Sequence, residues 1–357
     1  MKTYIRFLIN IFFNSFWKIF FLFFGIILII GILEEIEFFK NIDVHFSYPI
    51  FLSLLNTPSI IFEILPFIFL ISTQLFFIKL IDSHELVIFK YSGLTNIGII
   101  KIISLFTFIL GILIIIFYYN FSSLLQSKYL KIKNSYSQDN KYLAVINDNG
   151  LWIKDSINDK INIINASKVS NQFLFDVLIV QFDKNFELIR TIESEKIDIT
   201  TFNWKIKNSN ISENNASKKL EQMYFKSNFD LKKINTLFSN LSSLNFFDLI
   251  QLRKNYKSLN YSLTEIDSHL NKLISYPIYL TLITILTSII MFNINYQKSS
   301  LFRIILGIFL SVIIYYISNF FNVLGTSEKI PLFLSIWFPL IILSIINITF
   351  ILKLNEK

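Results

Sequence analysis

The stretch Ile81-Asp-Ser-His-Glu-Leu-Val-Ile-Phe-Lys-Tyr-Ser-Gly-Leu-Thr95 lies between two long apolar runs and has the features of a short helix with its own boundaries. Asp82 and Glu85 have the spacing of a capping box, in which each side chain satisfies a backbone N–H of the first turn. Gly93 stands where a helix usually ends in the left-handed conformation. The pattern predicts a helix over residues 82–93. We interpret it as a rigid surface that a partner protein grips; the alternative is a well-capped interfacial turn.

The composition is that of a membrane protein. Of 357 residues, 53% are hydrophobic, 17% are aromatic and only 16% are charged, whereas ordinary soluble domains contain about 25% charged residues. The absence of cysteine excludes disulfides and thiolate metal sites. The three histidines are far apart, and the chain has no Walker A, GxSxG or GxGxxG pattern. We therefore expect no catalytic site, no metal site and no cofactor.

Six apolar segments are candidates for transmembrane helices. Met1–Lys18 mixes basic and large apolar residues, which predicts an interfacial amphipathic helix that leads into the first span. The segment 34–57 is expected to be a short loop. The predicted spans, close to the roughly 20 residues that a helix needs to cross a bilayer, are Ile19–Leu33, Pro58–Ile78, Ile97–Phe121, Leu273–Phe292, Leu301–Phe321 and Pro331–Leu352.

From about Ser122 to Asp267 the chain becomes polar, and short segments alternate apolar and polar residues. The segments Leu174–Phe182 and Phe186–Ile192, separated by Asp183-Lys-Asn185, predict a β-hairpin. Several short strands with polar turns predict a β-sandwich or jelly roll outside the bilayer. Further alternating segments are Tyr142–Ile146, Leu151–Lys154, Ile161–Ile164 and Phe202–Lys207.

Helical periodicity returns before the fourth span. Asn245 is placed to cap a helix over Phe246–Lys257. Ser262 and Glu265 have the spacing of a second capping box, and the helix that they start is expected to continue into the fourth span past Pro277. The predicted domains are therefore residues 1–121, 122–267 and 268–357.

Basic residues in the short loops give the orientation, because cytoplasmic loops contain an excess of lysine and arginine. The short loops of one side contain only Lys40 and Lys329. The other side has Lys2, Arg6, Lys18, Lys79, Lys90, Lys298, Arg303, Lys353 and Lys357. Both termini and the 81–95 segment are therefore predicted to be cytoplasmic, and the strand-rich domain periplasmic. This bias and a lysine-rich outer domain account for the net charge of +8 without a nucleic-acid partner.

The fold class that follows is an α-helical membrane protein with six transmembrane helices and a periplasmic β-jelly-roll domain inserted between helices 3 and 4. Glu85 and Lys90 are candidates for ion pairs with a docking protein, or else are simply solvated. Glu63 is an intramembrane acid, and such acids are costly enough to suggest a function unless they reach the interface. Lys40, at the outer end of the first span, is placed to meet a lipid phosphate. Its acidic neighbours favour a solvated loop instead; they are Glu34, Glu35 and Glu37.

The order of three spans, a β domain and three further spans resembles a known family, and two segments carry a more specific resemblance to it. Ser83–Thr95 resembles the "SELVxxxASGxT" cytoplasmic segment of the lipopolysaccharide export permeases LptF/LptG, also called YjgP/YjgQ. Asn149–Asp155 is similar to the "GLWxKDG" start of the β domain in the LptG branch, which favours LptG over LptF. The resemblance covers essentially the whole chain.

The resemblance implies a transporter subunit without enzymatic activity of its own. It would pair with its homologue as an LptF/LptG heterodimer, and a dimer of the cytoplasmic ATPase LptB would dock on the segment that contains Glu85, Leu86, Lys90 and Gly93. Lipopolysaccharide would enter between the first and fifth spans, with Lys40 at its headgroup, and would pass through the jelly roll to LptC and LptA. Tyr91, where the family has a small residue, and the acids around Lys40 depart from the family pattern.

Three other functions remain open at this point. A permease of the lipoprotein-release or efflux type usually has four spans, so the count of six argues against it. A membrane-anchored enzyme would need a cluster of acids, bases or metal ligands, which the sequence does not contain. A scaffold that only anchors a β domain would not need six spans or a polar segment between two of them.

Overall fold

The computed structural model describes the whole chain except residues 1–2, 43, 137–150, 158–159, 171, 214–215, 232, 235–239, 259–260, 294–299 and 356–357. The chain divides into two compact units. A helical unit contains the residues up to Gln126 and those from Thr264 onward, and a second unit, Ser127–Leu263, contains the strands.

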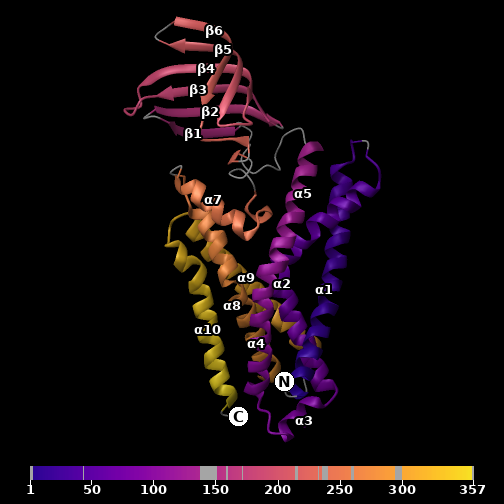
Figure 1. The fold of residues 1–357 in the computed structure, drawn as a ribbon. Coiled ribbons are helices and arrows are strands. Elements are labelled where there is room, and N and C mark those ends of the chain that lie inside the picture. Colours follow the sequence, from indigo (N-terminus) through magenta and orange to yellow (C-terminus); the bar gives the residue numbers. More distant parts are fainter. Residues whose placement is uncertain are drawn as a thin grey trace. The chain divides into compact units, whose positions relative to one another are not determined.

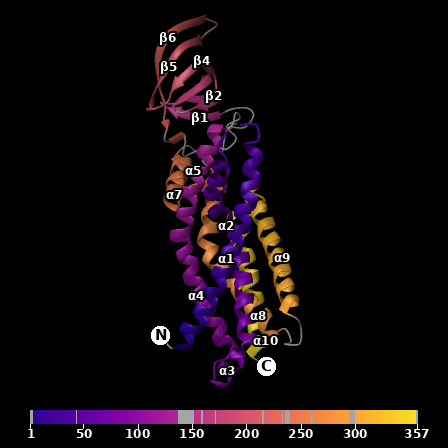
Figure 2. The ribbon, with the colours of Figure 1, turned by 90° about the vertical axis from the view of Figure 1, so that its right-hand side faces the viewer.

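Within the described residues, six helices are long and apolar enough to cross a membrane, which confirms the predicted number of spans. A short helix, α3 (Glu85–Tyr91), connects the second of them to the third. The start of α1, the end of α10 and α3 lie at the same end of the helical unit (Figures 1 and 2). The long helices are α1 (Thr3–Phe38), α2 (Ser47–Asp82), the continuous run α4 (Asn96–Leu113), η1 (Ile114–Tyr119, a π-helix) and α5 (Asn120–Tyr136), then α8 (Thr264–Asn293), α9 (Ser300–Thr326) and α10 (Leu332–Asn355).

Three helices extend beyond the predicted spans. The helix predicted over 1–18 and the first span are one continuous helix, because α1 runs without a break from Thr3. The loop predicted over 34–57 is shorter, because α2 begins at Ser47. The third span continues through η1 and α5 as far as Tyr136. With 36 residues at about 1.5 Å each, α1 is about 54 Å long, which exceeds the roughly 30 Å of a hydrocarbon core.

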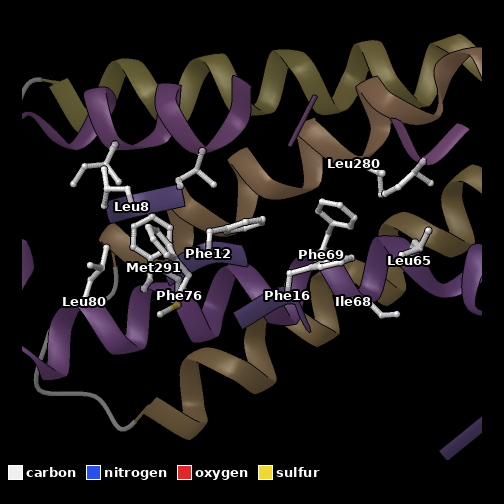
Figure 3. Close-up of a cluster of buried hydrophobic side chains, with 14 of the residues drawn as sticks. Leu8, Phe12, Phe16, Leu65, Ile68, Phe69, Phe76, Leu80, Leu280 and Met291 are labelled. Atoms are coloured by element: carbon white, nitrogen blue, oxygen red, sulfur yellow. The ribbon is translucent and has the colours of Figure 1, made fainter. Parts of the chain in front are cut away.

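Aromatic packing explains why the first residues of α1 belong to the bundle. Phe12 is fully buried, and its ring lies 6.4 Å from that of Phe69 and 5.9 Å from those of Phe76 and Phe106. Figure 3 shows the cluster, with Leu8, Phe12 and Phe16 of α1, Leu65, Ile68, Phe69, Phe76 and Leu80 of α2, and Leu280 and Met291 of α8.

Glycines allow two pairs of helices to approach closely. A Cβ on Gly111 of α4 would lie 2.9 Å from the Cα of Pro277 in α8. A Cβ on Gly31 of α1 would lie 2.5 Å from the Oγ of Ser53 in α2, which donates a hydrogen bond to the Leu28 carbonyl at 3.0 Å. Small residues at crossings are a common basis of helix association in membranes. The crossing at Gly111 therefore depends on the absence of a side chain, whereas at Gly31 a rotation of the Ser53 hydroxyl could make room.

Pro66 interrupts the hydrogen bonding of α2, and a tyrosine of α8 compensates for it. Because proline has no N–H, the carbonyl of Phe62 loses its donor within the helix. The Tyr276 hydroxyl donates to this carbonyl at 2.5 Å, and its ring stacks on that of Phe62 with centroids 4.7 Å apart. The Tyr118 hydroxyl donates to another carbonyl of α2, that of Pro58, at 3.0 Å. At Phe62, a neighbouring helix thus satisfies a backbone group that lipid could not.

Replacing Tyr276 by phenylalanine should destabilise the helical unit by about 1–3 kcal/mol, because the Phe62 carbonyl is left without a donor. In a Pro66→Ala background the N–H gained at position 66 restores the helical bond, so the same change should cost less. Thermal unfolding of the four variants in detergent measures this coupling. Equal costs in both backgrounds would show that Tyr276 does not compensate for the proline.

The predicted β domain between the third and fourth spans is confirmed as an antiparallel sheet. Each described strand pairs with the next in sequence, which gives an up-and-down order in place of the crossovers of a jelly roll. The predicted hairpin is present, with Leu178 opposite Glu193, whereas the predicted strand 142–146 lies outside the described residues. The strands are β1 (Leu151–Ile157), β2 (Lys160–Ser170), β3 (Phe173–Phe182), β4 (Leu188–Asp198), β5 (Asn203–Glu213) and β6 (Ala216–Lys226).

Asp155 links the first strand to the residues that follow the last one. It is fully buried in β1 and accepts hydrogen bonds from Ser227 Oγ at 2.8 Å and from Asn228 N at 3.0 Å, just beyond β6. The sheet must therefore curl, because its strand order separates β1 from β6. Next to this link, the Tyr261 hydroxyl donates to the Lys154 carbonyl at 3.2 Å. Burial raises the pKa of Tyr261 further above neutral pH, so this hydroxyl is protonated and able to donate.

Helices lead from the sheet back to the membrane spans. A 3-10 turn, η2 (Leu241–Ser243), precedes α7 (Phe246–Ser258). Asn245 caps α7 as predicted, since its Oδ1 accepts a hydrogen bond from Asp248 N at 2.9 Å. The next helix, α8, begins at Thr264 and continues past Pro277 into the fourth span, also as predicted.

Candidate functional site

Helix α3 is fastened to the helical unit by side chains on its inner face. Leu86 is only 2% exposed and belongs to the core cluster, and Phe89 packs against the same cluster. The ring of Phe89 also lies 6.0 Å from that of Phe7 near the start of α1. Because α3 contacts α1 as well as its neighbour α2, a displacement of α3 acts directly on both of these long helices.

The start of α3 differs from the predicted capping box. Asp82 is the last residue of α2, and α3 begins at Glu85 after His84, whose φ of 57° is left-handed. The helix has no side-chain cap in this described stretch; Val87 N donates to the His84 carbonyl at 3.1 Å instead. The predicted roles of Asp82 and Glu85 as caps are therefore wrong. The reason is that α2 stays packed through the fully buried Leu80, and so runs on to include Asp82.

Gly93 ends α3 in the left-handed conformation, as predicted, with φ of 83°. Its N–H donates to the Lys90 carbonyl, and Leu94 N donates to the Phe89 carbonyl, both at 3.0 Å. These two bonds form a Schellman motif. The Thr95 side chain then caps α4. Two consecutive caps leave little freedom between α3 and α4, so the direction of α3 is well fixed.

The outward side of α3 is an apolar surface that we call the docking face. It consists of Val87, Ile88 and Tyr91, which are 46%, 62% and 89% exposed. Lys90 is exposed beside it and Glu85 is half-buried. Exposed apolar side chains gathered on one side of a helix are typical of protein interaction sites. The arrangement suits a partner that buries these three side chains and meets the two charges around them.

The sequence-predicted residues of this segment divide into two kinds. Leu86 anchors α3 and Gly93 ends it, so both support the docking face without belonging to it. Glu85 and Lys90 remain available at the surface. Sequence reasoning overlooked Val87 and Ile88. Helical spacing separates these two positions from Leu86, but only the structure shows which side of the helix faces the core.

Lys40 is exposed in the turn that follows α1, at the end of α1 that is remote from its contact with α3. It forms no ion pair with another described residue. Of the nearby acids, Glu34 and Glu37 are exposed, but Glu35 is only 2% exposed. Two of the three acids therefore share the exposed surface with Lys40, and the third packs inside the helical unit.

Glu63 of α2 faces an oppositely charged residue that the sequence did not identify as its partner. Lys272 of α8 lies within electrostatic range of it. Both side chains are exposed on the surface of the helical unit. Charges within membrane helices usually face a partner or a water-filled cavity instead of lipid. The sequence shows a lysine shortly before Pro277, but it does not show that this lysine lies near Glu63, because the two residues are far apart in the chain.

The histidines take part in packing and turns. His269 bonds the Tyr119 hydroxyl at 3.0 Å through Nε2, and His45 Nδ1 lies 2.8 Å from Ser47 Oγ. His84 forms the joint before α3. In the part of the chain that the structure describes, no group of three or more histidine, aspartate or glutamate side chains is placed to hold a metal ion.

Comparison with known proteins identifies the family. A search of curated proteins gives no significant match. A family model described as "Lipopolysaccharide export system permease LptF/LptG" matches residues 6–353, nearly the whole chain. The matched region contains the docking face, the sheet and almost the full length of all six candidate membrane helices among the described residues. The chain therefore belongs to the lipopolysaccharide export system permease family LptF/LptG, as a multi-pass permease component of the inner membrane.

Proposed function

We propose that the chain is one half of an ATP-driven exporter that extracts lipopolysaccharide from the inner membrane. It pairs with a homologous permease subunit, as LptF with LptG, and a dimer of the ATPase LptB docks on α3. Lipopolysaccharide leaves the cavity between the two permeases and passes along the periplasmic strand domain to LptC and LptA. The observation on which this proposal rests is the docking face, an exposed apolar surface on a helix that is firmly anchored to two candidate membrane helices.

Two observations support α3 as the element that couples the ATPase to the membrane helices. Its outer side offers a contact surface, and its inner side holds Leu86 and Phe89 in the core. A partner that moves α3 therefore moves packed side chains and not a loose loop. The family match over residues 6–353 favours this function over a lipoprotein-release permease, and the Asn149–Asp155 segment favours the LptG branch.

The distribution of basic residues supports a cytoplasmic α3. Lys90 lies on α3, and Lys353 lies in the last turn of α10, which ends at the same end of the helical unit. The turns at the other end contain Lys40 and Lys329. An excess of lysine and arginine on one side marks the cytoplasm. This orientation makes the α9–α10 turn and the strand domain periplasmic.

Cysteine labelling tests this orientation directly, because the chain contains no cysteine. We expect Ser83→Cys, before α3, to react with an impermeant maleimide only after the inner membrane is opened. Ser327→Cys, between α9 and α10, and Trp152→Cys on β1 should react in intact spheroplasts; all three positions are exposed. Labelling of Ser83→Cys and Trp152→Cys from the same side would rule out the proposed mechanism.

A second prediction concerns Lys40 as a contact of the lipid headgroup. A photocrosslinker at the neighbouring exposed Asn41 should capture lipopolysaccharide, and Lys40→Glu should reduce that capture about fivefold, because each cation near an anionic lipid surface contributes roughly 1 kcal/mol. Lys329→Glu, an equal charge change in another exposed turn, serves as the control. Unchanged capture by the Lys40→Glu variant would support a solvated turn with no lipid contact.

A further inference from the structure

A groove beside the first turns of α1 has no role in the proposed transport route. It has a volume of about 600 Å³, which is within the usual range for small-ligand sites. Its lining combines one cation, two neutral polar residues and an aromatic wall. The lining residues are Thr3, Arg6, Phe7, Ile9, Asn10 and Phe13 of α1 and Phe106 of α4.

Among the described residues that line the groove, Arg6 alone is charged. Its side chain is exposed and forms no hydrogen bond or ion pair with any other residue that the structure describes. A guanidinium group presents a planar set of donors that matches phosphate oxygens. Asn10, one turn further along α1, and Thr3 add polar groups beside it. The groove therefore offers several donors and a positive charge, and none of its described lining residues is an acid that could neutralise that charge.

The apolar part of the groove follows the polar part along α1. Phe13 and Phe106 meet at 6.4 Å with their rings nearly perpendicular, and Trp17 continues the wall at 5.8 Å from Phe13. Phe13 and Trp17 are 37% and 38% exposed. Since Arg6 precedes Phe13 by seven residues, about 10 Å of helix separates the charge from the rings. A positive end followed by an apolar wall matches a phosphate headgroup followed by an acyl chain.

We propose that this groove is a binding site for an anionic phospholipid of the surrounding bilayer. The phosphate is held by Arg6, with Asn10 and Thr3 beside it, and an acyl chain lies along Phe13 and Phe106. A transmembrane helix of a partner protein fits these features less well, because it would need an acidic residue at the depth of Arg6. The inference concerns a resident lipid and does not depend on the identity of the exported lipid.

Because of its position, the groove would let a bound lipid affect α3. Phe7 lines the groove and its ring also lies 6.0 Å from that of Phe89, which packs α3 onto the core. A lipid in the groove therefore fills the space beside a contact between α1 and α3. It limits the freedom of Phe7, and with it the freedom of α3.

The test uses the purified protein with its co-purifying partners, in nanodiscs of phosphatidylcholine with a minor fraction of phosphatidylglycerol. Native mass spectrometry then counts the phosphatidylglycerol molecules that stay bound. We expect Arg6→Gln to weaken retention of one molecule about fivefold. Lys101→Gln, which removes another exposed cation near the start of α4 but outside the groove lining, should have no effect.

Two further measurements locate the site. Asn10→Trp should fill the groove and displace the lipid although Arg6 is still present, with an unchanged unfolding temperature. A phosphatidylglycerol with a photoactivatable acyl chain should crosslink to peptides that contain Phe13 or Phe106, and less so in the Arg6→Gln variant. Equal retention by the Arg6→Gln and Lys101→Gln variants, or equal crosslinking by phosphatidylcholine, would overturn the proposal. A crosslinker at Asn10 that captures a protein in place of lipid would assign the groove to a partner helix.

Discussion

Replacing Ile88 by glutamate should weaken capture of the ATPase subunit about 30-fold or more, because it places a charge in the centre of the docking face. The side chain is 62% exposed and lies between Val87 and the outward-pointing Tyr91, so its replacement does not disturb the core. Affinity purification of the permease, followed by quantification of the bound ATPase, measures the effect. The amount of inserted permease should stay the same.

Two matched variants sharpen this test. Ile88→Leu keeps an apolar side chain of the same size and should capture the ATPase normally. Glu85→Lys reverses a half-buried charge beside the docking face and should have a smaller effect, about fivefold, since charges at the edge of an interface act mainly on association. Wild-type yields of the ATPase with both Ile88→Glu and Glu85→Lys would remove α3 from the coupling mechanism.

Replacing Gly111 by alanine should destabilise the helical unit by about 1–3 kcal/mol, because overpacking of a close contact forces the backbone to move. The new Cβ would lie 2.9 Å from the Cα and 3.1 Å from the Cβ of Pro277. Neither atom belongs to a flexible side chain that can turn away. The unfolding temperature of the purified protein in detergent should fall accordingly.

Gly25 of α1 provides the control for this substitution. A Cβ at this position has no other atom within 4 Å. Gly25→Ala should therefore be neutral, or should stabilise the helix by up to about 1 kcal/mol through the higher helix propensity of alanine. If the Gly111→Ala and Gly25→Ala variants unfold at the same temperature, the crossing of α4 and α8 is looser than the contact at Pro277 indicates.

Hydropathy predicted the six spans and the position of the β domain, but it could not predict where the helices end. It detects the apolar part of a helix, whereas α5 continues to Tyr136 through residues that are no longer apolar overall. The packing of residues 1–18 escaped the sequence analysis for a different reason. Lys18 and Arg6 resemble interfacial residues, and only the tertiary contacts of Phe12 show that this segment packs inside the bundle.

In the α3 segment, too, the sequence predicted features that depend on local backbone conformation and missed those that depend on tertiary packing. Gly93 was predictable because a left-handed helix end is a local property of the backbone. The capping role of Asp82 was not, because the packing of α2 decides where that helix stops. Deciding that Leu86 is buried and Ile88 exposed required knowing which side of α3 faces the core. The electrostatic interaction of Glu63 with Lys272 acts between helices that are distant in sequence, and one sequence alone contains no record of it.

The unbroken length of α1 makes it a lever. It has 36 residues and no proline, touches α3 through Phe7 near one end and leads to Lys40 at the other. For a stiff rod of about 54 Å, a tilt of only about 5° moves the far tip by about 5 Å. A small push at the α3 end would thus arrive at the Lys40 end as a displacement as wide as a sugar ring, without any change in secondary structure.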